Sequence, residues 1–595
     1  MTTVQPNDDA VRRRSIRLDL IVAVVLAALL TTGWTLTDWP RLSRMLLPDP
    51  DDMMRLAQVR DWIAGQGIND WTQYRMAPPA GSPMHWSRIN DVGIAAIILA
   101  LTPLLGQASA EMVAVLVYPA LLFALAMFLS ARIARRLWGP QAGPIAAVLT
   151  ALAYPGTTVF IPGRIDHHAL QVVLIQLFVL LLMRAPTLRG GLIAGLVVGA
   201  SLIVGLETAP QVAALIAALA MLWVVRGMDE RARLAGFAAG LGATTAFFLI
   251  FLRPTYWTAT LCDAFTPASS TGALAVAVAL GLLAATTPRL KDWRTRIIVG
   301  ALFGAISLGL TLALFPSCIE GPYGEMDPFL LTNFMPFIDE ANSVFVQPRI
   351  ARMIAIGGLL AAGCAATLWM LVRDRQRRPE LWPVASVVLI SGLIMLFQVR
   401  GAYIGAPLAA PVLAGLVVAA RQRTDWQLPA VIGAWLAGAG MAYVEIPKQI
   451  ETMLTPTAVV AEINRPTTQV MCGAGDAWAQ IDRYPAGVTM AGTSVAAYLI
   501  GATHHSTIGA GYHRNNTGNM AMYHFFLSKP DAARGIGKAW KTDYVAFCPG
   551  DFEEIDVAHS FPDSLAAQLQ RGQAPAWLQP VPLRDTPLRF YRVVP

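Results

Sequence analysis

Two short polar clusters hold the residues of this chain that are best suited to chemistry. The first is Asp49-Pro50-Asp51-Asp52 and the second is Asp166-His167-His168. Carboxylates and imidazoles are costly next to hydrocarbon, so their presence at the ends of apolar stretches indicates a functional site. Carboxylates suit Mg²⁺ or Mn²⁺, and an added imidazole favours Mn²⁺. If both clusters face the same side of a membrane, they can converge on one divalent metal ion.

Each cluster also has a purely structural interpretation. The first can be a solvated turn at Pro48 and Pro50, but it lies just after an apolar stretch and opens a helical pattern, which favours a site. In the second, Asp166 would be a good N-cap for the helix that follows. An Asp two residues before a His at a helix start can also present two ligands in one direction. Metal binding or catalysis is therefore the preferred interpretation.

The composition is that of a polytopic membrane protein. Of the 595 residues, 55% are hydrophobic and only 14% are charged, whereas soluble domains carry about 25% charged residues. The formal charge of +7 does not indicate a nucleic-acid partner. Much of the Lys and Arg lies in short loops between apolar segments, where it determines orientation in the membrane. The lipid bilayer is therefore the expected environment.

The basic loops define a consistent orientation. Four arginines between residues 12 and 17 precede the first apolar stretch and place the segment 1–17 in the cytoplasm. The run 91–136 is ambiguous, because it can form two spans or an interfacial or re-entrant segment at 91–106 followed by one span. We prefer the second interpretation, since it places nearly every later basic loop inside.

This orientation predicts about thirteen spans within residues 18–445. Both polar clusters and the loops 39–90 and 317–348 then lie outside the cytoplasm. The predicted spans are approximately 18–38, 111–136, 140–158, 167–183, 190–206, 208–225, 234–252, 271–287, 297–316, 350–372, 381–398, 402–420 and 427–445.

The segment 446–595 forms a separate domain in this interpretation. It has no apolar run near the roughly 20 residues that a span needs. Strand-like segments at 487–491 and 543–547 and helical patterns at 529–540 and 562–571 predict a small extracytoplasmic α/β domain. An oxidising compartment would allow a disulfide between Cys472 and Cys548, with Cys262 and Cys318 as a weaker candidate pair. The predicted fold class is an all-α polytopic membrane protein with this small domain appended.

Two further charged residues are candidates for a site. Glu340 lies in the external loop, where the aromatic, Pro-broken segment 333–343 has the features of a cover for a site; the alternative is a loop that is acidic for solubility. Arg400, at the outer end of an apolar helix, can meet a phosphate at the membrane surface. Its alternative role is an anchor at the membrane interface. In the tail, 504–505 and 512–516 match no metal-binding spacing and are interpreted as polar loops or an acceptor-contact surface.

Together these features resemble the GT-C superfamily of integral-membrane glycosyltransferases, which use polyprenyl-phosphate-linked sugar donors. The nearest resemblance is to the catalytic subunit of archaeal oligosaccharyltransferases. That family has an Asp-Pro-x-x-x-x-Arg-Leu pattern after its first span, which is Asp49 to Leu56 here, and a Gly-x-x-Asp-His-His motif, which is Gly163 to His168. Residues 337–340 loosely match its external Thr-Ile-x-Glu element. Thirteen spans and an external C-terminal domain are also the architecture of that family.

One motif of the family is missing. Its Trp-Trp-Asp motif reads the hydroxyl amino acid of the glycosylation sequon, and no Trp-Trp pair occurs anywhere in this sequence. The resemblance therefore leaves the acceptor open, as a glycan, a lipid or a protein outside the cytoplasm.

The resemblance implies metal-dependent transfer of a sugar or oligosaccharide from a polyprenyl (pyro)phosphate donor in the plasma or inner membrane. Asp49, Asp166 and His168 would bind Mn²⁺ or Mg²⁺, with Glu340 as a further catalytic candidate. In this family an arginine at the start of a late helix contacts the donor phosphate, and Arg400 is its candidate here. Either Asp51 or Asp52 would activate the acceptor as general base.

Two other classes of function remain as alternatives. A transporter or flippase could use the same acids for ion coupling, but transporters bind near the membrane midplane and often have internal repeats. No repeat is evident here, and the acids lie at the ends of spans. A non-catalytic partner in polysaccharide assembly is the third class, with the tail domain as its working part.

Overall fold

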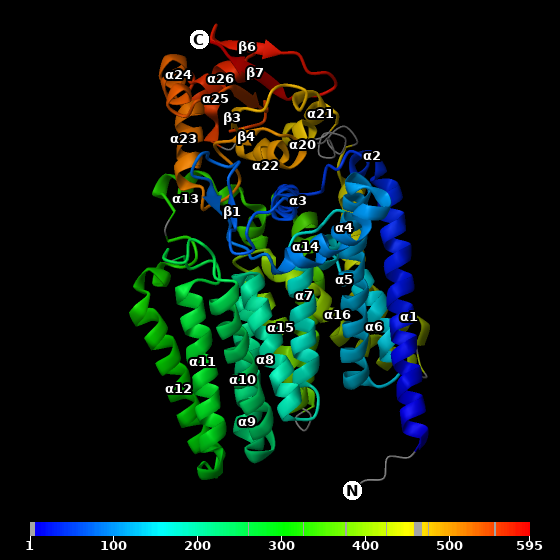
Figure 1. Cartoon of the computed structure of the whole chain (residues 1–595). Coiled ribbons are helices and arrows are strands. Elements are labelled where there is room, and N and C mark those ends of the chain that lie inside the picture. Colours follow the sequence, from blue (N-terminus) through cyan, green and yellow to red (C-terminus); the bar gives the residue numbers. More distant parts are fainter. Residues whose placement is uncertain are drawn as a thin grey trace.

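A bundle of long helices carries a small α/β domain on one end (Figure 1). The computed structural model describes residues 6–259, 261–324, 326–374, 378–423, 425, 427–456, 467–473, 475–552 and 555–595. The first described residues, at the start of α1 (Pro6–Thr37), lie at the opposite end of the bundle from this domain (Figure 1). The two ends of the molecule are thus different in kind, one made of helices alone and one covered by loops and a sheet.

Eight helices in the described part of the chain are long and apolar enough to cross a bilayer, and a pair bent by 93° gives a ninth. The eight lie in α1 (Pro6–Thr37), α5 (Gln107–Trp138), α9 (Ala209–Arg226), α10 (Met228–Phe251), α11 (Pro267–Thr286), α12 (Trp293–Leu314), α14 (Ile350–Arg373) and α16 (Arg400–Arg421), and the bent pair is α17 (Gln427–Gly438) with α18 (Gly440–Leu454).

Four shorter apolar helices occupy the remaining predicted spans. They are α6 (Ala142–Ala151), α7 (His168–Leu182), α8 (Leu188–Val204) and α15 (Arg378–Met395). A helix therefore lies at every predicted span, although α6, with 10 residues, is much shorter than the roughly 20 that a crossing needs. The number of spans stays a prediction.

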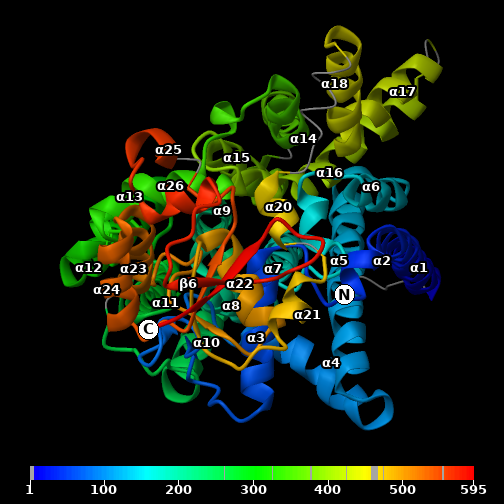
Figure 2. The ribbon, with the colours of Figure 1, turned by 90° about the horizontal axis from the view of Figure 1, so that it is seen from above.

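The ambiguous run 91–136 forms two very different helices. α4 (Ile89–Leu105) packs against α5 but does not run alongside the other helices. In the view from above, α4 is seen lengthwise while α1 is seen nearly end-on (Figure 2). This arrangement agrees with an interfacial or re-entrant segment followed by one long span.

The loop after α1 contains α2 (Trp39–Leu42), α3 (Pro50–Ile63) and the short antiparallel strands β1 (Thr72–Gln73) and β2 (Ser82–Pro83). Asp49 is the N-cap of α3, and its side chain accepts a hydrogen bond from the backbone N–H of Asp51 at 3.0 Å. Pro50 is the first helical residue, a position at which its missing N–H costs nothing. The first polar cluster therefore begins a helix, as predicted.

The loop before α14 is a chain of short turns. It contains α13 (Pro328–Asn333) and the 3-10 turns η4 (Pro316–Glu320), η5 (Met335–Phe337), η6 (Asp339–Ala341) and η7 (Val344–Val346). Further 3-10 turns are η1 (Gly156–Phe160), η2 (Leu206–Thr208) and η3 (Thr287–Arg289).

The tail domain has a five-stranded sheet in the order β4-β3-β5-β7-β6. β3 is parallel to β4 and β5, whereas β5, β7 and β6 are antiparallel. Its strands are β3 (Val488–Ala491), β4 (Ser506–Thr507), β5 (Tyr544–Phe547), β6 (Leu578–Val581) and β7 (Arg589–Val593). Its helices are α20 (Thr468–Gly473), α21 (Ala477–Ile481), α22 (Thr493–Ala502), α23 (Asn516–Leu527), α24 (Pro530–Ala539), α25 (Val557–Ser560) and α26 (Leu565–Gln570).

The predicted elements of the tail are present. The two strand-like segments are the neighbours β3 and β5, and the helical patterns correspond to α24 and α26. Disulfides join Cys472 to Cys548 and Cys262 to Cys318. α18 continues to Leu454, so the last bundle helix extends past the predicted domain boundary at residue 446.

The tail domain is fastened to the loop after α1. The backbone N–H of Ala77 donates to the carbonyl of Thr507, and the N–H of Thr507 donates to the carbonyl of Arg75, both at 2.8 Å. α22 packs on α3, where a Cβ at Gly501 would lie 2.8 Å from the carbonyl oxygen of Met53. Only glycine allows this approach. The tail and the first loop therefore cover the same end of the bundle as one body.

Candidate functional site

The two polar clusters meet through backbone hydrogen bonds. Asp52 is fully buried, and its Oδ1 accepts the N–H groups of Ile165 and Asp166, each at 2.9 Å. α7 begins only at His168 and its N-cap is His167, so Asp166 does not serve as the helix cap. The predicted convergence of the clusters at one end of the bundle is therefore right.

Two arginines, Arg55 fully buried and Arg164 partly buried, neutralise part of the acidic charge. Arg55 donates from Nη1 to Oδ1 of Asp91 at 3.1 Å and from Nη2 to Oδ1 of Asp166 at 3.0 Å. Arg164 places its Nη1 2.6 Å from Oδ2 of Asp49 and 3.4 Å from Oδ2 of Asp52. Buried carboxylates persist only when they are paired or neutral, so these arginines make the cluster possible.

Three residues form the Asp-His cluster: Asp166, His167 and His168. Each offers one ligand atom, and these atoms lie within 4.8 Å of one another. His167 faces carboxylates with both ring nitrogens, because Nδ1 is 2.7 Å from Oδ1 of Asp166 and Nε2 is 3.3 Å from Oε1 of Glu207. The other oxygen, Oδ2 of Asp166, is buried and forms no hydrogen bond among the described residues; it lies 3.4 Å from Nε2 of His168. The open donor atoms, which are the atoms left to bind a metal ion, are thus Oδ2 of Asp166 and Nε2 of His168.

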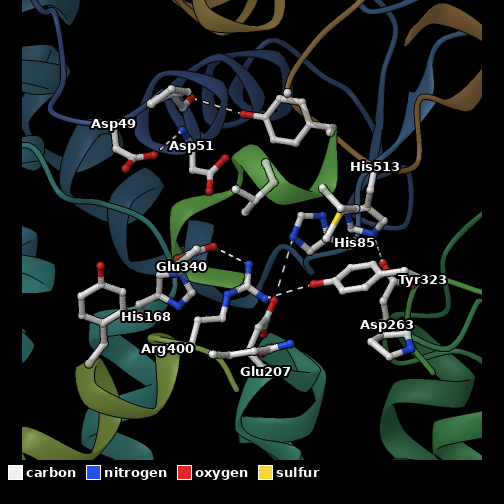
Figure 3. A pocket seen from close by; sticks show the side chains of 18 of the residues that line it. Asp49, Asp51, His85, His168, Glu207, Asp263, Tyr323, Glu340, Arg400 and His513 are labelled. Carbon is white, nitrogen blue, oxygen red and sulfur yellow. Dashed lines mark hydrogen bonds and ion pairs between the residues drawn. The ribbon is translucent and has the colours of Figure 1, made fainter. Parts of the chain in front are cut away.

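These groups border a cavity of about 1220 Å³ between the bundle and the tail domain (Figure 3). Of the predicted site residues, Asp49, Asp51, His168, Glu340 and Arg400 line it. Asp52 and Asp166 are not part of the lining and lie behind it. A single ligand pocket usually measures about 300–1,000 Å³, so this cavity has room for more than one substrate.

Arg400, the first residue of α16, holds the loop before α14 against the cavity. Its Nη2 forms an ion pair with Oε1 of Glu340, and its Nη1 donates to the hydroxyl of Tyr323 at 3.4 Å. The other oxygen of Glu340, Oε2, lies 3.8 Å from Nε2 of His168. Nε of Arg400 is buried and has no hydrogen-bond partner in the described chain. Glu340 thus connects the arginine with the Asp-His cluster.

No family model and no curated protein matches the sequence. Solved structures do match. The archaeal oligosaccharyltransferase AglB from Archaeoglobus fulgidus, in complex with an inhibitory peptide and a dolichol-phosphate, superposes with a TM-score of 0.64 at 15% identity, over 90% of this chain and 69% of that chain. The apo form of the Archaeoglobus fulgidus oligosaccharyltransferase gives a TM-score of 0.63 at 14% identity, over 95% and 73%. Its complex with Zn and sulfate gives 0.59 at 15%, over 89% and 67%.

This chain has the GT-C fold. The alignment with the apo form spans 95% of this chain's length. The predicted fold class is therefore confirmed, with a small C-terminal sheet beside a helical membrane bundle.

The GT-C cavity also contains residues to which the sequence analysis gave no role. They are His85, Glu207, Asp263 and Tyr323. His513 also lines the cavity, from the segment 512–516 that was interpreted as a polar loop or an acceptor-contact surface. Glu207 and Asp263 had weak signals only, the first as an acid at the outer end of a span and the second as the neighbour of a cysteine. The others lie in loops far apart in the sequence, and their types alone are common in any polar loop.

Burial and neighbouring charges shift the titration of the acids in opposite directions. Burial raises the pKa of Asp52 to about 8, although Arg164 opposes this shift. Burial, together with the nearby Asp49, also raises the pKa of Asp51 well above its usual value. For Asp166, burial acts in the same direction, but His167 and His168 outweigh it and hold the pKa well below the usual value. Of these three carboxylates, Asp166 is therefore the one that stays ionised.

The paired charge of Arg55 should be essential for stability. We expect Arg55→Met to lower the free energy of unfolding by about 3–5 kcal/mol, because it leaves Asp166 buried without its arginine and leaves Asp91 with Arg88 alone, at 3.4 Å. Thermal unfolding of the purified protein in detergent measures the loss. Arg41→Met, which breaks an ion pair between partly exposed side chains, is the control and should change stability little. Equal stability of the two variants would contradict this role of Arg55.

Proposed function

We propose that this protein is a metal-dependent glycosyltransferase. It moves a sugar or oligosaccharide from a polyprenyl (pyro)phosphate-linked donor to an acceptor outside the cytoplasm. One observation carries the proposal: the open donor atoms of the Asp-His cluster and the guanidinium of Arg400 meet beside one large cavity at the end of a GT-C bundle. The solved oligosaccharyltransferases of this fold, one with a dolichol-phosphate and one with Zn and sulfate, support the class of donor and a metal.

The arrangement of donor atoms fits a divalent cation. Two atoms bound at about 2.1 Å to one ion lie about 3.0–3.4 Å apart, and Oδ2 of Asp166 is 3.4 Å from Nε2 of His168. A buried carboxylate oxygen without a hydrogen bond is unusual and is expected at a metal site. Asp166, His168 and Glu340 would hold Mn²⁺ or Mg²⁺, with Asp49 as a further ligand. The ion would supply Lewis-acid stabilisation of negative charge.

Arg400 is suited to the donor phosphate. Its charge is held at the cavity wall by Glu340, and its Nε has no hydrogen-bond partner within the described residues. A positively charged hydrogen-bond donor that is held in place where negative charge develops lowers the barrier for departure of the phosphate. Of the two carboxylates predicted as general base, Asp51 lines the cavity and Asp52 does not, so Asp51 is the one within reach of a substrate.

The cavity would face the exterior of the plasma or inner membrane. Cys262 of one disulfide lines the cavity, and the other disulfide lies in the tail domain above it. Disulfides persist in oxidising compartments. At the opposite end of the bundle, Arg13, Arg14 and Arg17 lie near the start of α1, as expected for a cytoplasmic end. A site at the ends of helices also favours an enzyme over a transporter, which binds near the midplane.

Transfer by the purified protein tests the proposal. Undecaprenyl phosphates carrying a labelled glucose, galactose, mannose, arabinose or N-acetylglucosamine serve as donors, with Mn²⁺ present. We expect transfer from at least one donor, its loss in EDTA and its return when Mn²⁺ is restored, because the ion stabilises the departing phosphate. Transfer that persists in EDTA would refute the metal requirement. No transfer from any donor, combined with movement of the lipid between the leaflets of vesicles, would favour a flippase.

A further inference from the structure

A second set of polar groups lies across the cavity from the Asp-His cluster (Figure 3). Nε2 of His513 lies 2.6 Å from Oδ2 of Asp263, and Arg514 binds the same carboxylate through Nη2 at 2.6 Å and Nε at 3.0 Å. His513 and Asp263 both line the cavity. An imidazole oriented by a buried carboxylate at the edge of a substrate cavity is an arrangement that general-base catalysis uses.

The hydrogen bond to Asp263 determines which nitrogen of His513 is free to act. Arg514 and His513 hold the pKa of Asp263 below its usual value despite its burial, so this carboxyl is ionised and only accepts hydrogen bonds. Nε2 of His513 therefore carries the proton, and in the neutral ring Nδ1 carries the lone pair. Among the described residues, no group forms a hydrogen bond to Nδ1.

His513 is close to the proposed position of the donor phosphate. The ring of Tyr323 packs edge-on against His513, with centroids 5.2 Å apart, and the hydroxyl of the same tyrosine is 3.4 Å from Nη1 of Arg400. His85 packs against the imidazole of His513 at 5.1 Å and reaches towards Glu207, at 3.9 Å. One tyrosine side chain thus lies between His513 and Arg400, and all three residues line the same cavity.

We propose that His513 is the general base of the transfer, and that the acceptor is therefore a hydroxyl and not the amide of an asparagine. This inference rests on the proposed function. Nδ1 of His513 takes the proton of the acceptor hydroxyl as its oxygen forms a bond to the anomeric carbon of the donor. The bond from that carbon to the phosphate oxygen breaks, and the polyprenyl (pyro)phosphate leaves with the electron pair. The proton then passes from His513 to solvent.

The choice of a hydroxyl follows from the chemistry of the base. The oxygen of a hydroxyl has lone pairs available for attack, so an imidazole that removes the proton during attack is sufficient. The nitrogen lone pair of an amide is delocalised into its carbonyl, and a single imidazole does not restore it. The absence of a Trp-Trp pair from the sequence agrees with this acceptor class.

The test compares nucleophiles that do and do not need a base. The acceptors are methyl glycosides, a serine peptide, a peptide with an Asn-Xaa-Thr sequon, and azide, which is an anion without a proton to lose. We expect wild-type protein to use a hydroxyl acceptor, from the glycoside or the serine peptide, and not the sequon peptide. His513→Gln should lower transfer to the hydroxyl by about 10²–10⁴-fold and leave transfer to azide at the wild-type rate.

Matched variants separate a base from a structural residue. His504→Gln removes an imidazole that also pairs with an aspartate, but its side chain is 84% exposed and does not line the cavity, so it should change neither reaction. Loss of azide transfer in His513→Gln would make the residue structural and overturn the proposal. The proposal would also be overturned if Asp51→Asn, and not His513→Gln, selectively lost transfer to the hydroxyl. Transfer by the wild-type protein to the sequon peptide alone would overturn it too. A wild-type protein that transfers to no acceptor, azide included, would instead refute the proposed function.

Discussion

Replacing Asp166 by asparagine is expected to lower the rate of sugar transfer by about a thousandfold or more, because a metal contributes several kcal/mol of charge stabilisation and each 1.36 kcal/mol is tenfold in rate. Oδ2 of Asp166 is the buried oxygen without a hydrogen bond, next to Nε2 of His168. Asparagine keeps the shape of the side chain but removes its charge. Steady-state transfer from the lipid donor, measured over a range of Mn²⁺ concentrations, should show both a lower maximal rate and weaker metal binding.

Asp91→Asn is the matched control for this variant. Asp91 and Asp166 are both buried, and both accept a hydrogen bond from Arg55, at 3.1 and 3.0 Å. Each substitution therefore takes one carboxylate from the same arginine, but Asp91 is not part of the Asp-His cluster. Similar unfolding temperatures with activity lost only in Asp166→Asn would support the metal site. Equal loss of activity in both variants would assign the effect to Arg55 and refute a metal role for Asp166.

The parts of the fold that the sequence predicted were those governed by local pattern. Each bundle helix follows from an apolar run between charged loops, and the two clusters meet because the alternation of those loops put them at one end. Asp49 was correctly placed at a helix start, because an acid before Pro50 is a strong local signal. Glu340, in the loop before α14, and Arg400, at the start of α16, are 60 residues apart yet form an ion pair, and both were selected from their place at the outer end of the bundle.

The rest of the site depends on contacts that no local pattern encodes. Asp263 and His513 are 250 residues apart, and their contact exists because the tail domain is fastened to the first loop. Arg55 and Arg164 stand inside the two recognised motifs, but their pairing with buried acids appears only when the motifs are folded together. The number of membrane spans also does not follow from local pattern alone. α6 has the apolar pattern of a membrane helix, but its 10 residues are fewer than a bilayer crossing needs.

Replacing Arg400 by glutamine should lower kcat/KM for the lipid donor by about 10²–10³-fold, the usual effect of removing one preorganised donor to developing negative charge. Binding of undecaprenyl phosphate should weaken in parallel, because the charge of this guanidinium also contacts the ground-state phosphate in our proposal. Arg400→Lys keeps the charge but lacks the planar fork, so we expect it to recover only part of the loss. Donor titrations of the transfer rate and direct binding of undecaprenyl phosphate measure the two effects.

Arg349→Gln provides the comparison, because Arg349 also precedes a membrane helix, α14, and also pairs with a glutamate, Glu451 at 3.5 Å. It does not line the cavity. If charge near the membrane surface were enough to recruit the lipid donor, both arginine variants would raise KM alike. If Arg400 acts on the departing phosphate, only its variants lower kcat as well as donor binding. If Arg400→Gln has wild-type kcat and KM, the donor phosphate does not bind at Arg400. The proposed alignment of donor, His513 and acceptor is then wrong as well.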